Sequence, residues 1–292
     1  MSKNRFILLD ADASRPSRTP PSPSPLSLLV KADAADTEGR FTLLEGRGGH
    51  PVPSCDREEC DVFAYVLEGE LGVDHGGVTH RLTPGMCALL PRGVSHRVHA
   101  PSATPVRALY LVAPGAGEGS LRAPVPGQTP TRLGGAAEGP GDPDRFIVLD
   151  RGQARPGRVA VPPAFCVKAR TEDTEGRFSL LEVVVAQNIP RHVHHEADEA
   201  IYVLEGELTV EYDGRVHTAA EGQFVLLPHG VPHALRPGST PPPRVLQISA
   251  PGGWERFVEA TIEAGAKAGV GGRLDAAALN RVAAPHGITY EE

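Results

Sequence analysis

The sequence predicts an all-β protein made of two homologous domains in tandem, followed by a short helical tail. Its 33 glycines and 29 prolines among 292 residues supply turn residues throughout the chain, which suits many short strands. Apolar residues make up 40% of the chain, which is enough for a buried core in each of two domains. Several segments occur twice, which indicates that one fold is repeated.

The repeated segments establish the tandem arrangement. FILLD at 6–10 returns as FIVLD at 146–150, DTEGRFTLLE at 36–45 as DTEGRFSLLE at 173–182, YVLEGEL at 65–71 again at 202–208, and LYLVAPG at 109–115 as LQISAPG at 246–252. In the last three pairs every position is shifted by the same 137 residues, from 36 to 173 for example. This constant shift predicts two homologous domains with few insertions in either core.

The repeat and the local composition divide the chain into four segments. We predict a first domain at 1–115, a connector at 116–143, a second domain at 144–252 and a helical tail at 253–292. The connector is rich in Gly and Pro and lacks apolar periodicity, and the Pro-rich stretch at 16–25 is similar.

Apolar periodicity predicts strands within the domains and helices after them. The run at 200–210 alternates as a strand does, and Asp213-Gly214 beyond it is a strong hairpin signal. After Gly252 the pattern changes, because WERFVEATIEAGAKA at 254–268 and LDAAALNRVAAPHG at 274–287 combine helical spacing with good helix formers. We therefore expect a short helical tail that packs against the second domain.

Charge and hydropathy exclude two classes of partner. The chain has 29 Lys plus Arg against 36 Asp plus Glu, with no clustered basic stripe that could follow a phosphate backbone, so we expect no nucleic acid. No apolar run approaches the roughly 20 residues of a membrane helix, and the N-terminus does not resemble a signal peptide. We expect a cytoplasmic protein that contacts no membrane.

The four cysteines are expected to be free thiols. Cys55, Cys60, Cys87 and Cys166 lie in a chain without a recognisable leader, and the cytosol keeps thiols reduced. They form neither a CxxC motif nor the paired spacing of a zinc site.

Three histidines and a glutamate in the second copy have the pattern of a metal site. His192 and His194 are one residue apart in a segment expected to be extended, so both imidazoles leave the same face of the strand. Glu199 opens the next strand, and His233 follows after further turns of the chain. Ligands from separate strands would thus converge on one point.

The spacing around these residues resembles the two signature motifs of the cupin superfamily. The motifs read HxHxxxxE from His192, six residues, Gly206, and then Gly222, five residues, Pro228, one residue, Gly230, two residues and His233. The resemblance implies two cupin barrels, with a double-stranded β-helix or jelly-roll-like fold, in tandem. It also implies that His192, His194, Glu199 and His233 bind a metal ion inside the second barrel.

The donor set itself is consistent with that implication. Three neutral imidazoles and a carboxylate suit one divalent transition metal per chain, which could be iron, nickel, manganese, cobalt, copper or zinc. This donor set leaves coordination positions open for water, substrate or dioxygen. The alternative is a solvated or vestigial pocket. Burying these polar groups without a metal would cost several kcal/mol, which favours metal binding.

The positions of Glu199, His195 and His229 in the sequence predict a role for each of these side chains. Glu199 is a candidate general base, because a carboxylate ligand can take a proton from a bound hydroxyl. His195 must point away from His194 on a strand, so we expect it at the surface. His229 lies in a loop at the rim, where a solvated side chain and a substrate contact are the alternatives, the former being favoured.

The first copy retains the scaffold but not the ligands. Shifted back by 137 residues, His192, His194, Glu199 and His233 fall on Cys55, Arg57, Val62 and His96. The turn residues remain as Gly69, Gly85, Pro91 and Gly93. We expect a structural barrel without metal; the alternative is a rearranged site that uses Cys55, Cys60 or His50 with His96.

The two-barrel layout and the three-histidine, one-glutamate pattern are similar to quercetin 2,3-dioxygenase and related bicupin oxygenases. This resemblance implies a metal-dependent dioxygenase acting on a small enolisable or aromatic, flavonoid-like molecule of secondary metabolism. In that family the metal binds a deprotonated enol or phenol, a glutamate removes the proton, and dioxygen adds across a carbon–carbon bond; Glu199 would be that glutamate.

Other readings of the same site stay open. One is a non-redox metal-dependent isomerase, cyclase, lyase or hydrolase, and another is a small-molecule-binding cupin without activity. Exchange of the Pro-rich N-terminal arm makes a homodimer plausible. Side chains expected at the pocket or in the core around it are Phe165, Val167, Ile201, Val203, Phe224 and Gln247.

Overall fold

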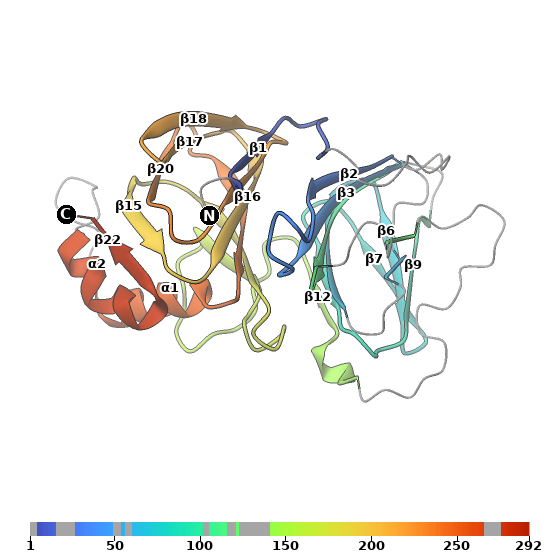
Figure 1. The fold of residues 1–292 in the computed structure, drawn as a ribbon. Coiled ribbons are helices and arrows are strands. Elements are labelled where there is room, and N and C mark those ends of the chain that lie inside the picture. The colour runs from blue at the N-terminus through green and yellow to red at the C-terminus, as the bar shows by residue number, and fades with distance from the viewer. Residues whose placement is uncertain are drawn as a thin grey trace. The chain divides into compact units, whose positions relative to one another are not determined.

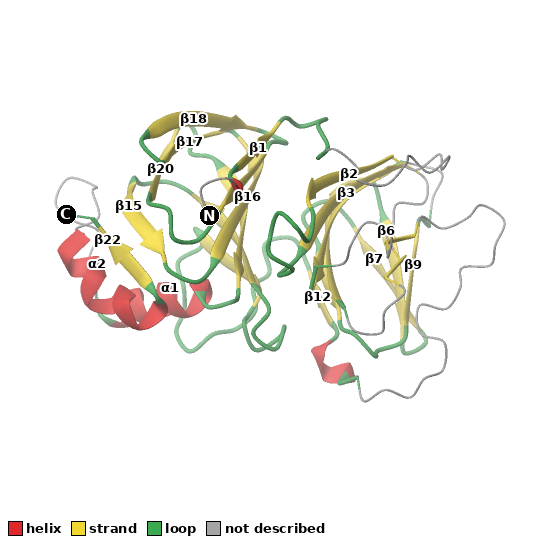
Figure 2. Cartoon of the chain, in the orientation of Figure 1, coloured by secondary structure: helices red, strands yellow, loops and turns green. Residues whose placement is uncertain are grey.

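The chain forms two compact units that consist mainly of antiparallel strands (Figures 1 and 2). The computed structural model describes residues 5–15, 27–48, 54–55, 60–101, 105–115, 121–122, 141–265 and 276–291. We call Ala13–Gln153 the first domain, and Met1–Asp12 together with Ala154–Glu292 the second domain.

The second domain consists of two sheets. One has the strand order β1-β19-β16-β21-β14-β13 and the other β18-β17-β20-β15-β22. Their bounds are β1 Ile7–Leu9, β13 Phe165–Ala169, β14 Ser179–Val184, β15 Ile189–His194, β16 Asp198–Glu205, β17 Glu207–Tyr212, β18 Arg215–Ala220, β19 Phe224–Leu227, β20 His233–Pro237, β21 Arg244–Ala250 and β22 Ile288–Tyr290. Apolar residues of both sheets share one buried core, so the sheets face each other as in a jelly roll and do not form one closed barrel.

The first domain repeats this topology. Its six-stranded sheet has the order β12-β8-β5-β10-β3-β2, which corresponds strand by strand to the six-stranded sheet of the second domain, and β7-β6-β9 and β11-β4 form smaller sheets. The bounds are β2 Ser27–Ala32, β3 Thr42–Gly48, β4 Ser54–Cys55, β5 Asp61–Glu68, β6 Leu71–His75, β7 Val78–Leu82, β8 Cys87–Leu90, β9 His96–His99, β10 Val106–Ala113, β11 Leu121–Arg122 and β12 Ile147–Leu149. The prediction of one fold repeated twice is confirmed.

Turn chemistry explains several of the strand junctions. Asp213 and Gly214 both have positive φ, 47° and 75°, and connect β17 to β18 in the hairpin that their sequence predicts. Gly206 has a φ of 77°, and a Cβ there would lie 3.1 Å from the backbone Cα of Pro243, so glycine is strongly favoured between β16 and β17. Its counterpart Gly69 has a φ of 75°, which shows that the first domain keeps the same turn.

The first strand of each repeat pairs outside the predicted domain ranges. The FILLD strand β1 pairs with β19, and the FIVLD strand β12 pairs with β8. Residues 1–12 therefore belong to the second domain and 141–153 to the first, which corrects the predicted ranges 1–115 and 144–252. The repeat showed that these segments are equivalent strands, but the sequence of a strand does not state which sheet edge it joins.

A buried ion pair fastens each of these strands. Arg5, just before β1, binds both carboxylate oxygens of buried Asp198 at 2.8 and 2.9 Å, and the backbone N–H of His229 donates to the same carboxylate. Arg145, just before β12, binds buried Asp61, which also accepts from the backbone of a neighbouring loop. The two domains thus use the same arginine–aspartate pair at the equivalent place.

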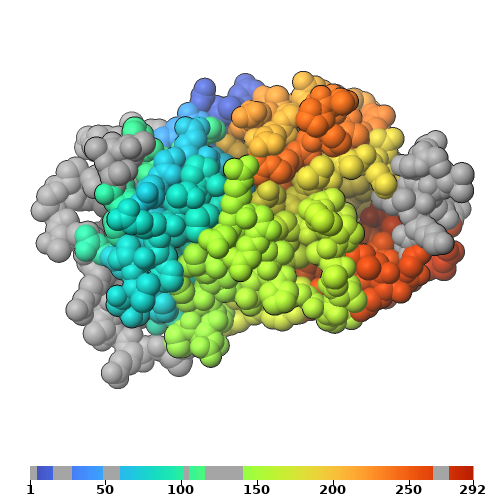
Figure 3. Space-filling model, turned by 180° about the vertical axis from the view of Figure 1, so that it is seen from behind, coloured from blue at the N-terminus to red at the C-terminus, as the bar shows by residue number. Residues whose placement is uncertain are grey.

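The C-terminal tail is only partly helical. Helix α1 spans Trp254–Glu263 and helix α2 spans Ala276–Ala283, with short 3₁₀ turns at Ala284–His286 and, before β12, at Pro143–Arg145. The predicted short helical tail is confirmed, and after its helices it also contains strand β22, which the sequence did not predict and which pairs with β15. Figures 1 and 3 show the tail in red at the surface of the second domain. No helix in the described ranges is long and apolar enough to cross a membrane.

The predicted connector lies mostly outside the described residues. Within 116–143, the structure describes β11 and the residues from 141 onward. Cys60, Cys87 and Cys166 form no disulfide with one another, as predicted, and the side chain of Cys55 lies outside the described residues.

Candidate metal centre

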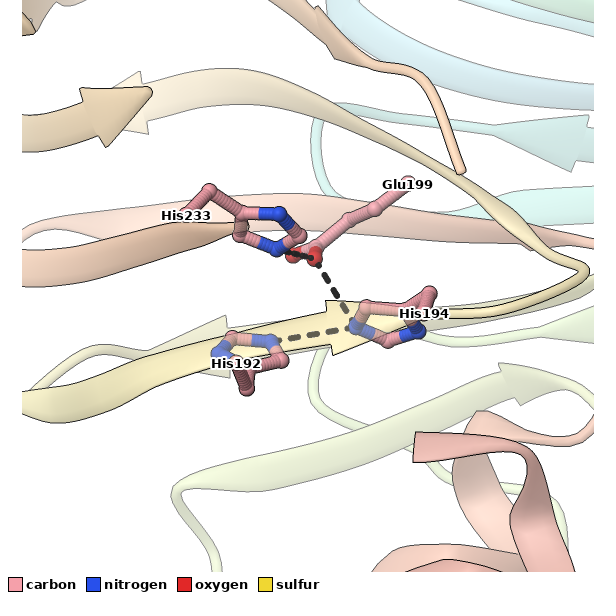
Figure 4. Close-up of side chains that lie close together, drawn as sticks. All are labelled: His192, His194, Glu199 and His233. Carbon is pink, nitrogen blue, oxygen red and sulfur yellow. Dashed lines mark hydrogen bonds and ion pairs between the residues drawn. The ribbon is translucent and has the colours of Figure 1, made fainter. Parts of the chain in front are cut away.

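Strands β15, β16 and β20 bring the four predicted ligands together. His192 and His194 alternate with Val193 on β15 and leave the same face, Glu199 is the second residue of β16, and His233 is the first of β20. Figure 4 shows the four side chains pointing toward one another. All four are buried, and none is more than 4% exposed.

The donor atoms are spaced as ligands of one ion would be. His192 Nε2 lies 3.1 Å from His194 Nε2, and Glu199 Oε2 lies 3.4 Å from His194 Nε2 and 3.0 Å from His233 Nε2. All four donor atoms lie within 4.8 Å of one another. Atoms bound to a common ion at about 2.1 Å are about 3.0 Å apart in an octahedral arrangement and about 3.4 Å apart in a tetrahedral one.

Backbone carbonyls orient two of the imidazoles. His192 Nδ1 lies 2.9 Å from the carbonyl oxygen of Pro190, and His233 Nδ1 lies 3.1 Å from that of Val231. A carbonyl oxygen only accepts, so each Nδ1 carries the proton and each Nε2 turns a lone pair toward the cluster. Metal-binding histidines commonly have this second contact, which fixes the tautomer.

Burial also sets the charge states that a metal requires. Burial lowers the pKa of His192 well below its usual value, with the neighbouring His233 and His194 acting in the same direction. Burial likewise lowers the pKa of His194, although Glu199 opposes this effect. For Glu199, burial favours the neutral acid, but protonated His194 and His233, whose Nε2–H groups would donate to the carboxylate, outweigh burial and lower its pKa. Neutral imidazoles and a charged carboxylate are the forms that bind metals.

Gln247 holds the second oxygen of the glutamate. Gln247 lies on β21, where it pairs with Ile201 of β16, the strand that carries Glu199. The Nε2 group of Gln247 donates to Glu199 Oε1 at 2.7 Å. This contact leaves Oε2 as the oxygen that faces the three imidazoles. Of the expected pocket side chains, Gln247 thus contacts the cluster, while Val167, Ile201 and Val203 belong to the apolar core.

Aromatic side chains of the tail border the cluster. The ring of Tyr290 on β22 stacks on His192 with a centroid distance of 5.0 Å, and Trp254 on α1 lies 5.6 Å from His194. Burial raises the pKa of the Tyr290 phenol, and the charge of Glu199 raises it further. Tyr290 was not predicted from the sequence, where the alternation of ITY after Gly287 is only a weak strand signal.

Neither of the other two histidines joins the cluster. His195 points away and is exposed, with its Nε2 2.9 Å from Thr289 Oγ1, as predicted. His229 Nδ1 lies 2.7 Å from Asp198 Oδ1 and 3.1 Å from Arg5 Nη2, so it takes part in the ion pair that fastens β1. This contact adds a structural role to the two alternatives considered for His229.

The equivalent position in the first domain has a different character. Val62 occupies the place of Glu199 on β5 and is buried in the apolar core. His96 on β9 keeps the position of His233, with Nδ1 2.9 Å from the carbonyl oxygen of Val94. Arg57 and His50 lie outside the described residues, and so does the side chain of Cys55. In the part of the chain that the structure describes, the second domain holds the one cluster suited to a metal ion.

Comparison with known families and structures agrees with this fold. The model of the cupin domain matches residues 39–112 and again 179–248. The E. coli protein YlbA has a similar fold, with a TM-score of 0.57 at 12% identity over 84% of this chain and 90% of that one. A Pseudomonas aeruginosa protein, named as a candidate glyoxylate-induced protein, has a TM-score of 0.57 at 16% identity over 84% of this chain and 87% of that one.

Oxalate decarboxylase also has this fold. A point mutant of the Bacillus subtilis enzyme has a TM-score of 0.51 at 14% identity, covering 77% of this chain and 72% of the enzyme. No curated protein sequence matches significantly. Each of the two domains therefore contains one segment that matches the cupin domain, and the chain has a two-cupin fold.

Proposed function

We propose that the protein is a metal-dependent oxygenase whose active site is the cluster of His192, His194, Glu199 and His233. The observation that carries this proposal is the convergence of three imidazole nitrogens and one carboxylate oxygen at ligand spacing inside a buried site. Without a cation, the lone pairs and the carboxylate would face one another in an apolar interior. The residues present therefore fit a divalent transition metal.

Each residue of the cluster has a definite task in this proposal. The three histidines hold the ion, with the tautomers of His192 and His233 fixed by carbonyl oxygens. Glu199 completes the donor set through Oε2 while Gln247 restrains Oε1. A hydroxyl group of a substrate beside Glu199 would give its proton to that carboxylate, which leaves an anionic oxygen on the substrate.

When bound, the metal would supply a Lewis acid for the substrate oxygen and, if it is redox-active, electrons for dioxygen chemistry. The substrate class is then a small enolisable or aromatic molecule, because such molecules carry an acidic hydroxyl group next to a carbon–carbon bond. The aromatic rings of Tyr290 and Trp254 beside the cluster are compatible with a planar substrate.

Oxygen uptake tests this proposal directly. Protein loaded with iron, nickel, manganese, cobalt or copper would be incubated with flavonols, dihydroxybenzoids and β-diketones while dissolved oxygen is recorded. We expect substrate-dependent uptake with at least one pair of metal and compound, and none with H194A protein. Metal-loaded protein that consumes no oxygen with any compound would contradict the oxygenase proposal.

A second candidate is a non-redox reaction at the same cluster, such as a lyase or decarboxylase reaction. It is favoured by the donor set, which binds zinc as readily as a redox metal, and by the fold shared with oxalate decarboxylase. Zinc in the purified protein, together with product formation in the absence of oxygen, would select this candidate. Tight ligand binding without any turnover would instead indicate a binding protein.

A further inference from the structure

The C-terminal strand β22 forms one side of the metal centre. In the pairing of β15 with β22, Tyr290 lies directly opposite His192, and Ile288 lies opposite His194. Directly opposed residues of an antiparallel pair project from the same face, which explains why the Tyr290 ring stacks on the His192 ring. A residue of the tail thus reaches a ligand of the proposed metal.

The backbone of Tyr290 is held in place from two sides. Its N–H donates to Asn280 Oδ1 at 2.7 Å, and its carbonyl oxygen accepts from Asn280 Nδ2 at 2.8 Å. On the other side, the N–H of Glu291 donates to the carbonyl oxygen of Arg191 at 2.8 Å. The amide of Asn280 on α2 therefore replaces a neighbouring strand at this sheet edge, and it fixes where the tyrosine side chain lies.

The hydroxyl group of Tyr290 is available to a ligand. The residue is only 3% exposed, and its hydroxyl has no hydrogen-bond partner among the residues that the structure describes. It lies within electrostatic reach of Glu199. Such a hydroxyl can donate a hydrogen bond to a bound acceptor.

A second unpartnered donor lies near the cluster. The indole Nε1 of Trp254 is buried and has no hydrogen-bond partner in the described part of the chain. Its ring adjoins His194, as the ring of Tyr290 adjoins His192. The Tyr290 hydroxyl and the Trp254 indole N–H, both without hydrogen-bond partners in the described part of the chain, lie near the four-residue cluster. They indicate that a polar ligand binds there.

We propose that the Tyr290 hydroxyl donates a hydrogen bond to an anionic oxygen of the ligand at the metal centre, and so selects enolates, phenolates and carboxylates. This inference rests on the proposed metal centre and names the chemistry that the centre recognises. A phenol donates to an oxygen anion in a water-poor site with a strong, charge-assisted hydrogen bond. A neutral nitrogen ligand such as imidazole has no anionic oxygen to accept this charge-assisted hydrogen bond, so it gains much less from the hydroxyl.

The test compares two small probes on Co²⁺-loaded protein. Acetate supplies an anionic oxygen and imidazole a neutral nitrogen, and the visible bands of Co²⁺ report the binding of either. In Y290F, which keeps the ring and removes the hydroxyl, we expect acetate affinity to fall by about 10-fold or more and imidazole affinity to stay within about 2-fold. Y202F is the matched control, because Tyr202 is buried on the face of β16 opposite Glu199, and it should change neither affinity.

Each other outcome has a distinct meaning. Unchanged acetate affinity in Y290F would overturn the role of Tyr290 while leaving the metal centre intact. An equal loss for both probes, or loss of Co²⁺ from Y290F, would also overturn it, because the residue would then serve only the structure of the site. Wild-type protein that binds no Co²⁺ would overturn the metal centre itself, and the inference with it.

Discussion

At the scale of single residues, Glu199 carries the largest share of the proposed chemistry. It is the one anionic member of the cluster, and its two oxygens have separate partners, Gln247 on one side and the histidines on the other. The same carboxylate would thus both bind the metal and receive a substrate proton. Substitution of Glu199 distinguishes these two roles.

We expect E199Q to lower metal affinity by about 10-fold or more, because an amide oxygen is a weaker ligand than a carboxylate. At saturating metal, its turnover should remain far below that of the wild type, because glutamine cannot accept the proton. Metal-buffer titration and turnover at full occupancy would measure the two effects. E205Q, at the exposed end of the same strand, should behave as wild type, and full turnover by metal-loaded E199Q would exclude the base role.

A different buried glutamate gives the fold a defined acid dependence. Glu259 on α1 binds Arg170 at 2.8 Å and Arg158 at 3.2 Å. Burial favours its neutral form, but these arginines outweigh burial and lower the pKa. In the unfolded chain the pKa of a glutamate is about 4.3. Between that pH and the lowered folded pKa, the unfolded chain binds more protons than the native one, so this contribution to stability exists above about pH 4.3 and is lost on further acidification.

E259Q should therefore lower the free energy of unfolding at neutral pH by about 1–3 kcal/mol and flatten its decline below about pH 4.3. Urea unfolding at a series of pH values would measure both effects. E263Q is the control, because Glu263 also faces Arg158, at 3.4 Å, but is 41% exposed. An E259Q protein with the acid dependence of the wild type would show that the buried pair has no such role.

At the scale of elements, the second domain takes strands from both ends of the chain. A division of the sequence into consecutive ranges therefore does not describe it. Strand β1 comes from the N-terminal segment and extends the sheet that contains β16, and β22 comes from the C-terminal segment and extends the sheet that contains β15. Strand β22 pairs directly with β15, which carries two of the proposed ligands. Strand β1 pairs with β19, which in turn pairs with β16, the strand that carries Glu199. Segments far apart in the chain therefore help to position the site.

Local patterns explain what the sequence predicted at this scale and what it missed. HxH in a strand specifies one face, and Asp213-Gly214 specifies a hairpin, because both depend only on neighbouring residues. The contact between Gln247 and Glu199, and that between Tyr290 and His192, depend on pairing between strands far apart in the chain. No local periodicity contains that information.

The fastening of β1 by Arg5 leads to a stability prediction. R5A should leave the fully buried carboxylate of Asp198 with fewer donors and destabilise the protein by about 1–3 kcal/mol. Thermal unfolding of R5A, with R215A at an exposed position of β18 as control, would measure this. If R5A and R215A were equally stable, β1 would be held by its backbone pairing alone.

At the scale of the whole molecule, the two domains share a scaffold but differ in their interiors. Both contain the same order of strands, the same positive-φ turn glycines and the same arginine–aspartate pair. Where the second domain has Glu199 and Gln247 in contact, the first has Val62 and Tyr110 in its apolar core. An apolar interior at this position would leave a metal without its anionic ligand, so we expect the first domain to serve the fold and not the chemistry.

The metal content of the purified chain tests the central claim most directly. Protein purified without chelators or an affinity nickel column would be measured by elemental analysis as wild type, H194A and H96A. We predict one transition metal ion per chain in the wild type and in H96A, and none in H194A. Two ions per wild-type chain, an ion retained by H194A, or an ion lost from H96A would contradict a single metal centre in the second domain.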